Sequence, residues 1–167
     1  MSRGFVKEDD QEEIPMVPPR ADLPDGLTNY VTRTGLNELL AEKKSLINEK
    51  TNLDNSNEND KRIALNFINA KLRLLNNRIS TAKVVDPKEQ PRNEIRFGAV
   101  ITLKIEATKR IQTFQIVGVD EANISKGKIA FTSPLAKILL NKKIGDRAIL
   151  KRDKENIIFE IMGIAYS

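Results

Sequence analysis

The chain has 167 residues, of which 40% are hydrophobic and 31% charged, and its net charge is +5 at pH 7. This composition is that of a globular protein, and no apolar run approaches the roughly 20 residues that span a bilayer. The lack of cysteine and histidine excludes disulfides, thiol nucleophiles, histidine-based triads and the commonest zinc sites. We therefore expect a cytoplasmic protein with no membrane partner.

Charge is distributed unevenly along the chain. The first 60 residues carry a net negative charge, whereas the remainder is net positive. A basic C-terminal half favours an acidic partner, such as nucleic acid or an acidic protein surface. A surface that only keeps the protein soluble explains the same charge equally well.

Residues 1–28 are predicted to form a disordered arm. Acidic residues cluster between Glu8 and Glu13, and prolines recur between Pro15 and Pro24. Such a segment buries too little apolar surface to offset the entropy lost on ordering. Its first residues also lack the basic start and apolar stretch of a secretory signal.

Residues 29–86 are predicted to form an antiparallel coiled-coil hairpin. The first helix begins near Thr32, a plausible N-cap, and carries leucines seven residues apart at Leu39, Leu46 and Leu53. The second helix runs from about Lys61 to Ala82. Its apolar residues alternate spacings of three and four, at Leu65, Ile68, Leu72, Leu75, Ile79 and Ala82. Between the helices, residues 54–60 are rich in Asn, Asp and Ser, which favour a turn.

Residues 87–96 are predicted to be a linker, and residues 97–167 a small antiparallel sheet domain with one helix, so the fold class is α+β. Apolar and β-branched residues predict strands at 100–105, 111–117, 128–132, 147–151 and 157–164. Pro134 suits the first turn of the helix, with Ser133 as its N-cap. Leu135, Ile138 and Leu139 are expected to face inward.

Several short motifs resemble the C-terminal domain of the GreA/GreB family of bacterial transcript-cleavage factors. In chain order they are Phe97-Gly98-Ala99, Gln115-Ile116-Val117-Gly118, Asp120-Glu121-Ala122, Ser133-Pro134-Leu135-Ala136-Lys137 and Leu140-Asn141-Lys142-Lys143-Ile144-Gly145-Asp146. Upstream, Tyr30-Val31-Thr32 with Gly35 resembles the family's helix start, and Ala82-Lys83-Val84-Val85-Asp86 resembles its hairpin exit. The resemblance covers about residues 29–167. It implies an FKBP-like sheet domain after the hairpin.

The resemblance also implies a function. Members of the family dock on RNA polymerase, insert the hairpin through the secondary channel and stimulate cleavage of the nascent RNA 3′ end in backtracked complexes. The protein would then not be an enzyme by itself, because it stimulates the endonucleolytic activity of the polymerase. We expect a monomer with no stably bound cofactor, sharing magnesium with the polymerase active site.

Residue by residue, Asp54 and Glu58 match the catalytic acids of the family and would hold a second magnesium ion within the polymerase complex. The alternative is that these acids, and Asp60, are ordinary turn and capping residues. Polymerase docking is expected at Ser133, Pro134, Leu135, Lys137, Gly145 and Asp146. Contacts with RNA are expected at Arg73, Arg78 and Lys83, although a solvated helix face explains the same residues.

Two other functions remain open, and the first of them follows from the tip, which departs from the family pattern. Leu53 replaces a glycine before Asp54, the two acids lie one residue further apart, and no aromatic residue follows. A non-cleaving regulator that enters the same channel is therefore one alternative. The other is a peptidyl-prolyl isomerase or chaperone, suggested by the FKBP-like domain. That chemistry needs an aromatic-lined pocket for proline, and the domain is poor in aromatic residues.

Overall fold

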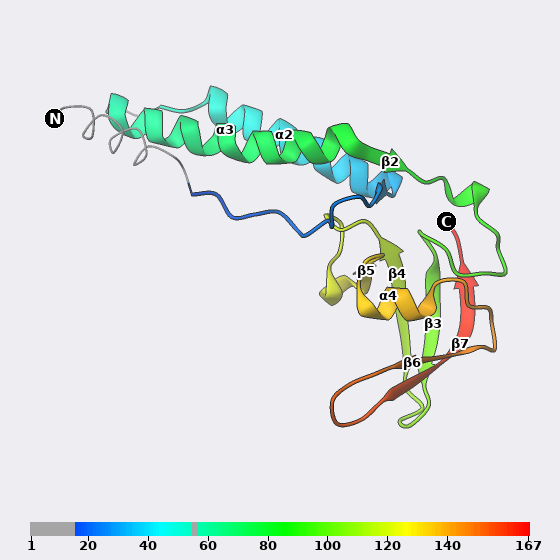
Figure 1. The fold of residues 1–167 in the computed structure, drawn as a ribbon. Helices are drawn as coiled ribbons and strands as arrows, with labels where there is room; N and C mark the ends of the chain where they lie inside the picture. The colour runs from blue at the N-terminus through cyan, green and yellow to red at the C-terminus, as the bar shows by residue number, and fades with distance from the viewer. Residues whose placement is uncertain (1–15, 55–56) are drawn as a thin grey trace. The chain divides into compact units, whose positions relative to one another are not determined.

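The computed structural model describes residues 16–54 and 57–167, which form two compact units (Figure 1). Residues 1–15 of the predicted arm lie outside the described residues. The first unit, here called the hairpin unit, contains Leu39–Thr81 and the described residues up to Arg20. The second, the sheet unit, contains Ala21–Glu38 and Ala82–Ser167. None of the helices described is long and apolar enough to cross a membrane.

The hairpin unit is built on helices α2 (Arg33–Thr51) and α3 (Glu58–Thr81). At about 1.5 Å per residue, their 19 and 24 residues span about 28 and 36 Å. Leu39 and Leu46 of α2 pack against Ile68 and Leu75 of α3, and all four are buried. Leu53, Leu72 and Ile79 extend this contact along the pair. The heptad stripe of the first helix and the apolar stripe of the second therefore face each other, as predicted.

The sheet unit contains a five-stranded sheet in the order β5-β4-β3-β7-β6. Its strands are β3 (Val100–Ile105), β4 (Ile111–Val117), β5 (Lys128–Ala130), β6 (Arg147–Leu150) and β7 (Ile157–Ala165). The prediction of an all-antiparallel sheet is wrong, because β5 runs parallel to β4, with Gln115 opposite Lys128. Side chains alternate between the two faces whether a strand runs parallel or antiparallel, so the apolar pattern does not reveal strand direction.

Helix α4 (Pro134–Leu139) lies against one face of the sheet. The Ser133 hydroxyl accepts a hydrogen bond from the Ala136 amide at 3.2 Å, which confirms the predicted N-cap. Ala136 and Leu139 are buried, while Leu135 and Ile138 are only partly buried at the edge of the core. The helix contacts both β5 and β6, the two edges of the sheet. Those edges would lie about 19 Å apart in a flat sheet, so the sheet curves around α4.

A second, two-stranded parallel sheet was not predicted. It pairs β1 (Asn29–Val31) with β2 (Ala82–Val84), and Tyr30 lies opposite Lys83. The Tyr30 ring packs on Phe97 and Phe131, with ring centroids 5.8 Å away in each case. A Cβ atom on Gly118 would lie 2.5 Å from the Tyr30 carbonyl oxygen, so only glycine permits this approach. These contacts hold β1 against the sheet.

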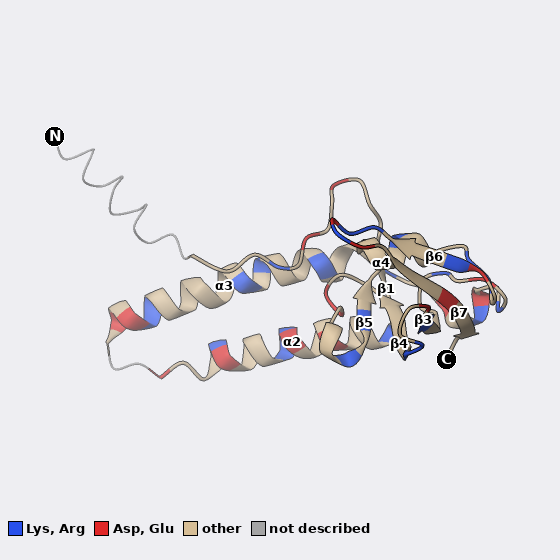
Figure 2. Ribbon diagram, turned by 90° about the horizontal axis from the view of Figure 1, so that it is seen from below, with Lys and Arg blue, Asp and Glu red and all other residues tan. Residues whose placement is uncertain are grey.

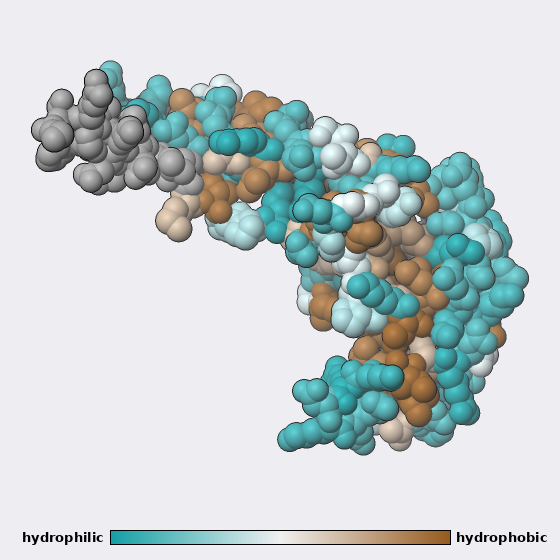
Figure 3. All heavy atoms as spheres, viewed as in Figure 1, coloured by the Kyte–Doolittle hydropathy of each residue, from teal (hydrophilic) through white to brown (hydrophobic). Residues whose placement is uncertain are grey.

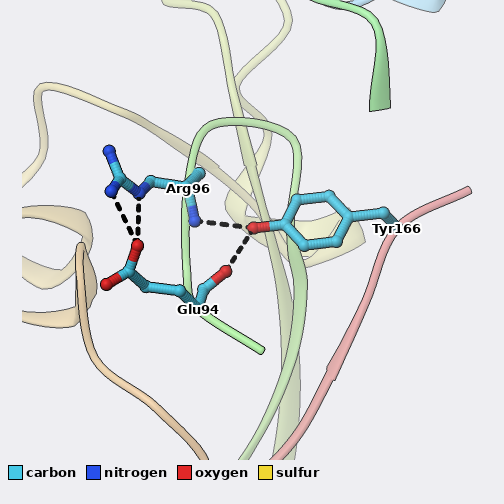
Figure 4. Close-up of polar contacts among 3 residues, drawn as sticks. All are labelled: Glu94, Arg96 and Tyr166. Atoms are coloured by element: carbon cyan, nitrogen blue, oxygen red, sulfur yellow. Dashed lines mark hydrogen bonds and ion pairs between the residues drawn. The ribbon is translucent and has the colours of Figure 1, made fainter. Parts of the chain in front are cut away.

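The predicted linker is tied to the C-terminal end of the sheet unit by Tyr166 (Figure 4). It begins with a short 3-10 helix, Pro87–Glu89, capped by Asp86. Further along, the Tyr166 hydroxyl donates to the Glu94 carbonyl oxygen at 2.6 Å and accepts from the Arg96 amide at 2.7 Å. Burial raises the pKa of Tyr166 above its ordinary value, and the Arg96 backbone bond and charge oppose this rise.

We predict that Tyr166→Phe lowers the free energy of unfolding by about 1 to 3 kcal/mol at neutral pH, because two hydrogen bonds are lost. Since the folded-state pKa is raised, the contribution of Tyr166 is complete below the unfolded pKa of about 10 and declines as pH rises through the folded pKa. Denaturant unfolding at pH 7 and at alkaline pH measures this. A difference between wild type and Tyr166→Phe that does not shrink above about pH 10 would contradict it.

Candidate functional site

The acids expected to be catalytic lie at the two helix ends that form the hairpin tip. Asp54 follows the end of α2, and Glu58 is the first residue of α3; both are exposed. Residues 55 and 56 between them lie outside the described residues. Figure 2 shows acidic positions at the start of α3. The structure therefore places both candidate acids at the solvent-exposed tip.

Helix α3 begins earlier than the predicted Lys61 because Asn57 caps it. The Asn57 side-chain oxygen accepts a hydrogen bond from the Asn59 amide at 2.9 Å. Its backbone carbonyl accepts from the Lys61 amide at 3.0 Å. Glu58 and Asp60 thus occupy the first turn of α3, where the helix dipole favours carboxylates. A local structural role exists for both acids whatever else they do.

The tip carboxylates could supply only part of a metal site. Within residues 16–54 and 57–167, no group of three or more His, Cys, Asp or Glu side chains is placed to hold a metal ion. Magnesium keeps several waters and takes one or two protein carboxylates when a partner supplies the remaining ligands. Asp54 and Glu58 fit such a shared site, since both are carboxylates exposed to solvent.

The basic residues expected to contact RNA do not form a single cluster within either unit. Arg73 is exposed and Arg78 half-buried on α3, in the hairpin unit. Lys83 is exposed on β2, in the sheet unit, and its Nζ atom lies 5.9 Å from the centroid of the Tyr30 ring. No compact unit carries all three, so their shared role remains a prediction.

Three of the expected docking residues have structural roles around α4. Ser133 caps the helix, as described above. The Asp146 carboxylate accepts from the Lys143 amide at 2.8 Å and closes the turn that leads into β6. Gly145 in this turn has φ +91°, a conformation that favours glycine. Pro134 and Lys137 are exposed on the outer surface of α4, whereas Leu135 is half-buried at the edge of the core.

A groove of about 460 Å³ opens beside α4. Figure 3 shows hydrophobic residues gathered on the face that carries this helix. The groove is lined by Ala122, Asn123, Ile124, Lys128, Ile129, Ala130, Ser133, Pro134, Leu135, Leu150 and Arg152. No aromatic side chain lines this groove. Such an apolar groove with basic residues among its lining suits an amphipathic element with acidic side chains.

A buried carboxylate at the start of α2 was missed by the sequence analysis. The Glu121 side chain is only 3% exposed, and its Oε2 atom lies 3.0 Å from the Lys128 ammonium nitrogen. Its Oε1 atom accepts a hydrogen bond from the Thr32 hydroxyl at 2.5 Å. Thr32 in turn caps α2, since its hydroxyl oxygen accepts from the Gly35 amide at 2.9 Å. Glu121 therefore fastens the first turn of α2 to the sheet.

Glycine at position 35 is part of the same arrangement. A Cβ atom there would lie 2.7 Å from Glu121 Oε1. The sequence did carry a signal, because Thr32, Gly35 and Glu121 all belong to the motifs quoted above. Their contact could not be read from spacing, since Thr32 and Glu121 are 89 residues apart.

Comparison with known proteins gives a consistent result. A sequence model of the family described as "Transcription elongation factor, GreA/GreB, C-term" matches residues 90–166. Transcription elongation factor GreA of Ruegeria pomeroyi is 37% identical over 114 residues, which are 68% of this chain and 72% of that protein. GreA of Acidiphilium cryptum is 35% identical over 113 residues, with the same two coverages of 68% and 72%.

Other relatives are matched over a smaller share of their length. GreA of Maricaulis maris is 32% identical over 100 residues, so this chain spans 64% of that relative.

Among solved structures, GreA factor homolog 1 of Thermus thermophilus is 21% identical, with a TM-score of 0.40, covering 83% of this chain and 99% of that one. GreA/GreB of Nitrosomonas europaea is 16% identical, with a TM-score of 0.42, covering 89% and 100%.

We predict that Thr32→Ala and Glu121→Gln are non-additive. Thr32→Ala removes the hydroxyl donor and Glu121→Gln removes the charge of its acceptor, so the double variant should lose less stability than the sum of the two single variants. The coupling energy should be about 0.5 to 3 kcal/mol. Denaturant unfolding of the four proteins measures it. The control replaces Thr32→Ala by Thr28→Ala, at an exposed position before β1, and should be additive with Glu121→Gln. Additivity between Thr32→Ala and Glu121→Gln would show that the bond is not formed.

Proposed function

Because the chain belongs to the GreA/GreB family of transcription elongation factors, we propose that it binds RNA polymerase and stimulates cleavage of backtracked RNA from the secondary channel. One observation carries this proposal: two exposed carboxylates, Asp54 and Glu58, flank the tip of a two-helix hairpin. A hairpin of about 28 to 36 Å, held together by the buried Leu39, Leu46, Ile68 and Leu75, suits insertion into a narrow channel.

The residues at the tip have a limited task in this mechanism. A magnesium ion shared with the polymerase would polarise the phosphodiester and lower the pKa of the attacking water. Asp54 and Glu58 would bind that ion and orient the water through their carboxylate oxygens. Asn57 would keep Glu58 in place, because its cap determines where α3 begins. The packed leucines below the tip keep the two helices together.

Docking is assigned in this proposal to the groove beside α4. The curvature of the sheet around α4 supports the FKBP-like description of this unit. Leu135 and Ile124 offer apolar contact, and Arg152 and Lys137 add positive charge in and near the groove. A polymerase helix with apolar and acidic side chains would fit this surface. An isomerase function is not supported by the groove, which has no aromatic lining.

A non-cleaving regulator of the same channel is the second candidate. Leu53 packs against the core of the hairpin, where the family pattern has a glycine. Glu58 is already helical rather than part of a free turn. Both features limit how far the two acids can rearrange around a shared ion. They favour a protein that occupies the channel without promoting cleavage.

We predict that Asp54→Asn/Glu58→Gln strongly reduces RNA cleavage while leaving polymerase binding intact. Cleavage should fall on the order of a hundredfold, because the shared ion and water lose their ligands. The measurement is release of 3′ fragments from stalled, backtracked complexes of the cognate polymerase. The control is Glu38→Gln/Glu49→Gln, which removes the same charge from exposed positions of α2. Wild-type protein that binds but cuts no faster than polymerase alone would support the non-cleaving regulator.

We predict that Ile124→Glu weakens polymerase binding on the order of tenfold, because a carboxylate would replace apolar contact in the groove. Ile124 is 75% exposed, so the change should leave the fold intact. Ile111→Glu is the matched control, since Ile111 is 56% exposed and lies outside the groove. Binding is measured by competition with labelled wild-type protein. Equal losses for the two variants would place the docking surface elsewhere.

A further inference from the structure

The end of the sheet that carries the β3–β4 and β6–β7 turns bears a group of exposed cations. The exposed cations of these two turns are Lys109, Arg110, Lys151, Arg152 and Lys154. Glu106 in the first turn and Asp153 and Glu155 in the second oppose them, and Glu106 lies 3.7 Å from Arg147. Throughout residues 16–54 and 57–167, none of the five cations has an ion-pair partner. Their charge is therefore available to a ligand.

The strand order places the two turns next to each other. Strands β3 and β7 are neighbours, and Ile105 lies opposite Phe159. The Glu106 amide donates to the Ile158 carbonyl at 2.9 Å, which links the base of one turn to the other hairpin. Figure 1 shows both turns at the same end of the sheet. Because the hairpins are displaced by two strands, their turns lie about 10 Å apart.

The first turn has a defined shape. The Lys109 amide donates to the Ile105 carbonyl at 2.8 Å, and the Ile105 amide donates to the Arg110 carbonyl at 2.9 Å. Lys109 adopts φ +61°, in the left-handed region. The backbone that presents Lys109 and Arg110 is thus held by hydrogen bonds on both sides of the turn, and these two side chains project from a fixed base.

We propose that this basic end, defined by Lys109, Arg110, Lys151, Arg152 and Lys154, binds the phosphate backbone of double-stranded DNA. The turns contain no aromatic side chain that could stack on an unpaired base. The two basic turns lie about 10 Å apart. This distance matches the separation of the two phosphate backbones across a groove of a duplex, whose grooves are about 6 to 12 Å wide. Binding is independent of base sequence, since only phosphates are contacted. This surface goes beyond the proposed function.

The test is fluorescence anisotropy of a labelled 20-base-pair duplex, about two helical turns, titrated with the full chain at several salt concentrations. The test variant is Lys109→Gln/Arg110→Gln/Lys151→Gln/Lys154→Gln. Arg152 is left unchanged because it also lines the groove beside α4. The matched control is Lys44→Gln/Lys50→Gln/Lys61→Gln/Lys88→Gln, which removes the same charge from exposed positions elsewhere.

The test variant should bind the duplex roughly tenfold or more weakly than wild type at low salt. The slope of log affinity against log salt should fall in magnitude by about 2 to 4, at roughly 0.9 for each lost phosphate contact. The control should bind within about twofold of wild type. Variants of one turn alone are Lys109→Gln/Arg110→Gln and Lys151→Gln/Lys154→Gln. Their affinity for the duplex should lie between those of wild type and the test variant, because each turn contacts one phosphate backbone.

Three results would overturn the proposal. The first is no duplex binding by wild-type protein at low salt. The second is equal weakening by the test and control variants, which would show that net charge alone is responsible. The third is equal or tighter binding of single-stranded DNA of the same length, which would remove the role of the groove. Polymerase binding and RNA cleavage by the test variant report separately on the proposed function, since the variant keeps Arg152 and every other residue that lines the groove beside α4.

Discussion

The carboxylate of Glu121 determines how the sheet unit holds the beginning of α2. A buried charge is costly unless it is paired and hydrogen-bonded, and Lys128 and Thr32 provide both. Because the same Thr32 hydroxyl caps α2, the first residue of the hairpin is set by a side chain from the β4–β5 connection. Gly35 leaves the room that this carboxylate needs, and Gly118 leaves room for the nearby Tyr30 carbonyl. The ion pair with Lys128, the hydrogen bond from Thr32 and the close approach of Gly35 thus all involve one carboxylate.

Much of the fold could be predicted from the sequence, because periodic apolar patterns carry most of it. The stripe through Leu39, Leu46 and Leu53, the strands after Ala99 and the cap at Ser133 all depend on neighbours in sequence. The missed features depend on distant partners. Strands β1 and β2 have three residues each, too few to show a period, and form only because they meet each other. The direction of β5 likewise depends on its pairing with β4.

The candidate site, like the fold, has features that could be predicted from the sequence and features that could not. The identity of the tip acids could be read from the chain, whereas their setting depends on Asn57, whose cap moves the start of α3 to Glu58. Three of the residues predicted for docking, Ser133, Gly145 and Asp146, hold the start of α4 and the turn that follows it. Motifs preserve both kinds of residue, so a motif alone cannot separate a surface that binds from the turns that support it. To tell a binding residue from a supporting one requires the exposure and the hydrogen bonds of its side chain.

The parallel pairing of β1 with β2 has a consequence for the order of folding. Parallel neighbours cannot be joined by a tight turn and need a long crossover, and here the crossover is the whole α2–α3 hairpin. A flexible chain of that length would make closure entropically costly, whereas a hairpin of local contacts forms quickly and brings its ends together. We therefore expect the helices to form before the ladder, and mutations that slow helix pairing to delay completion of the sheet unit as well.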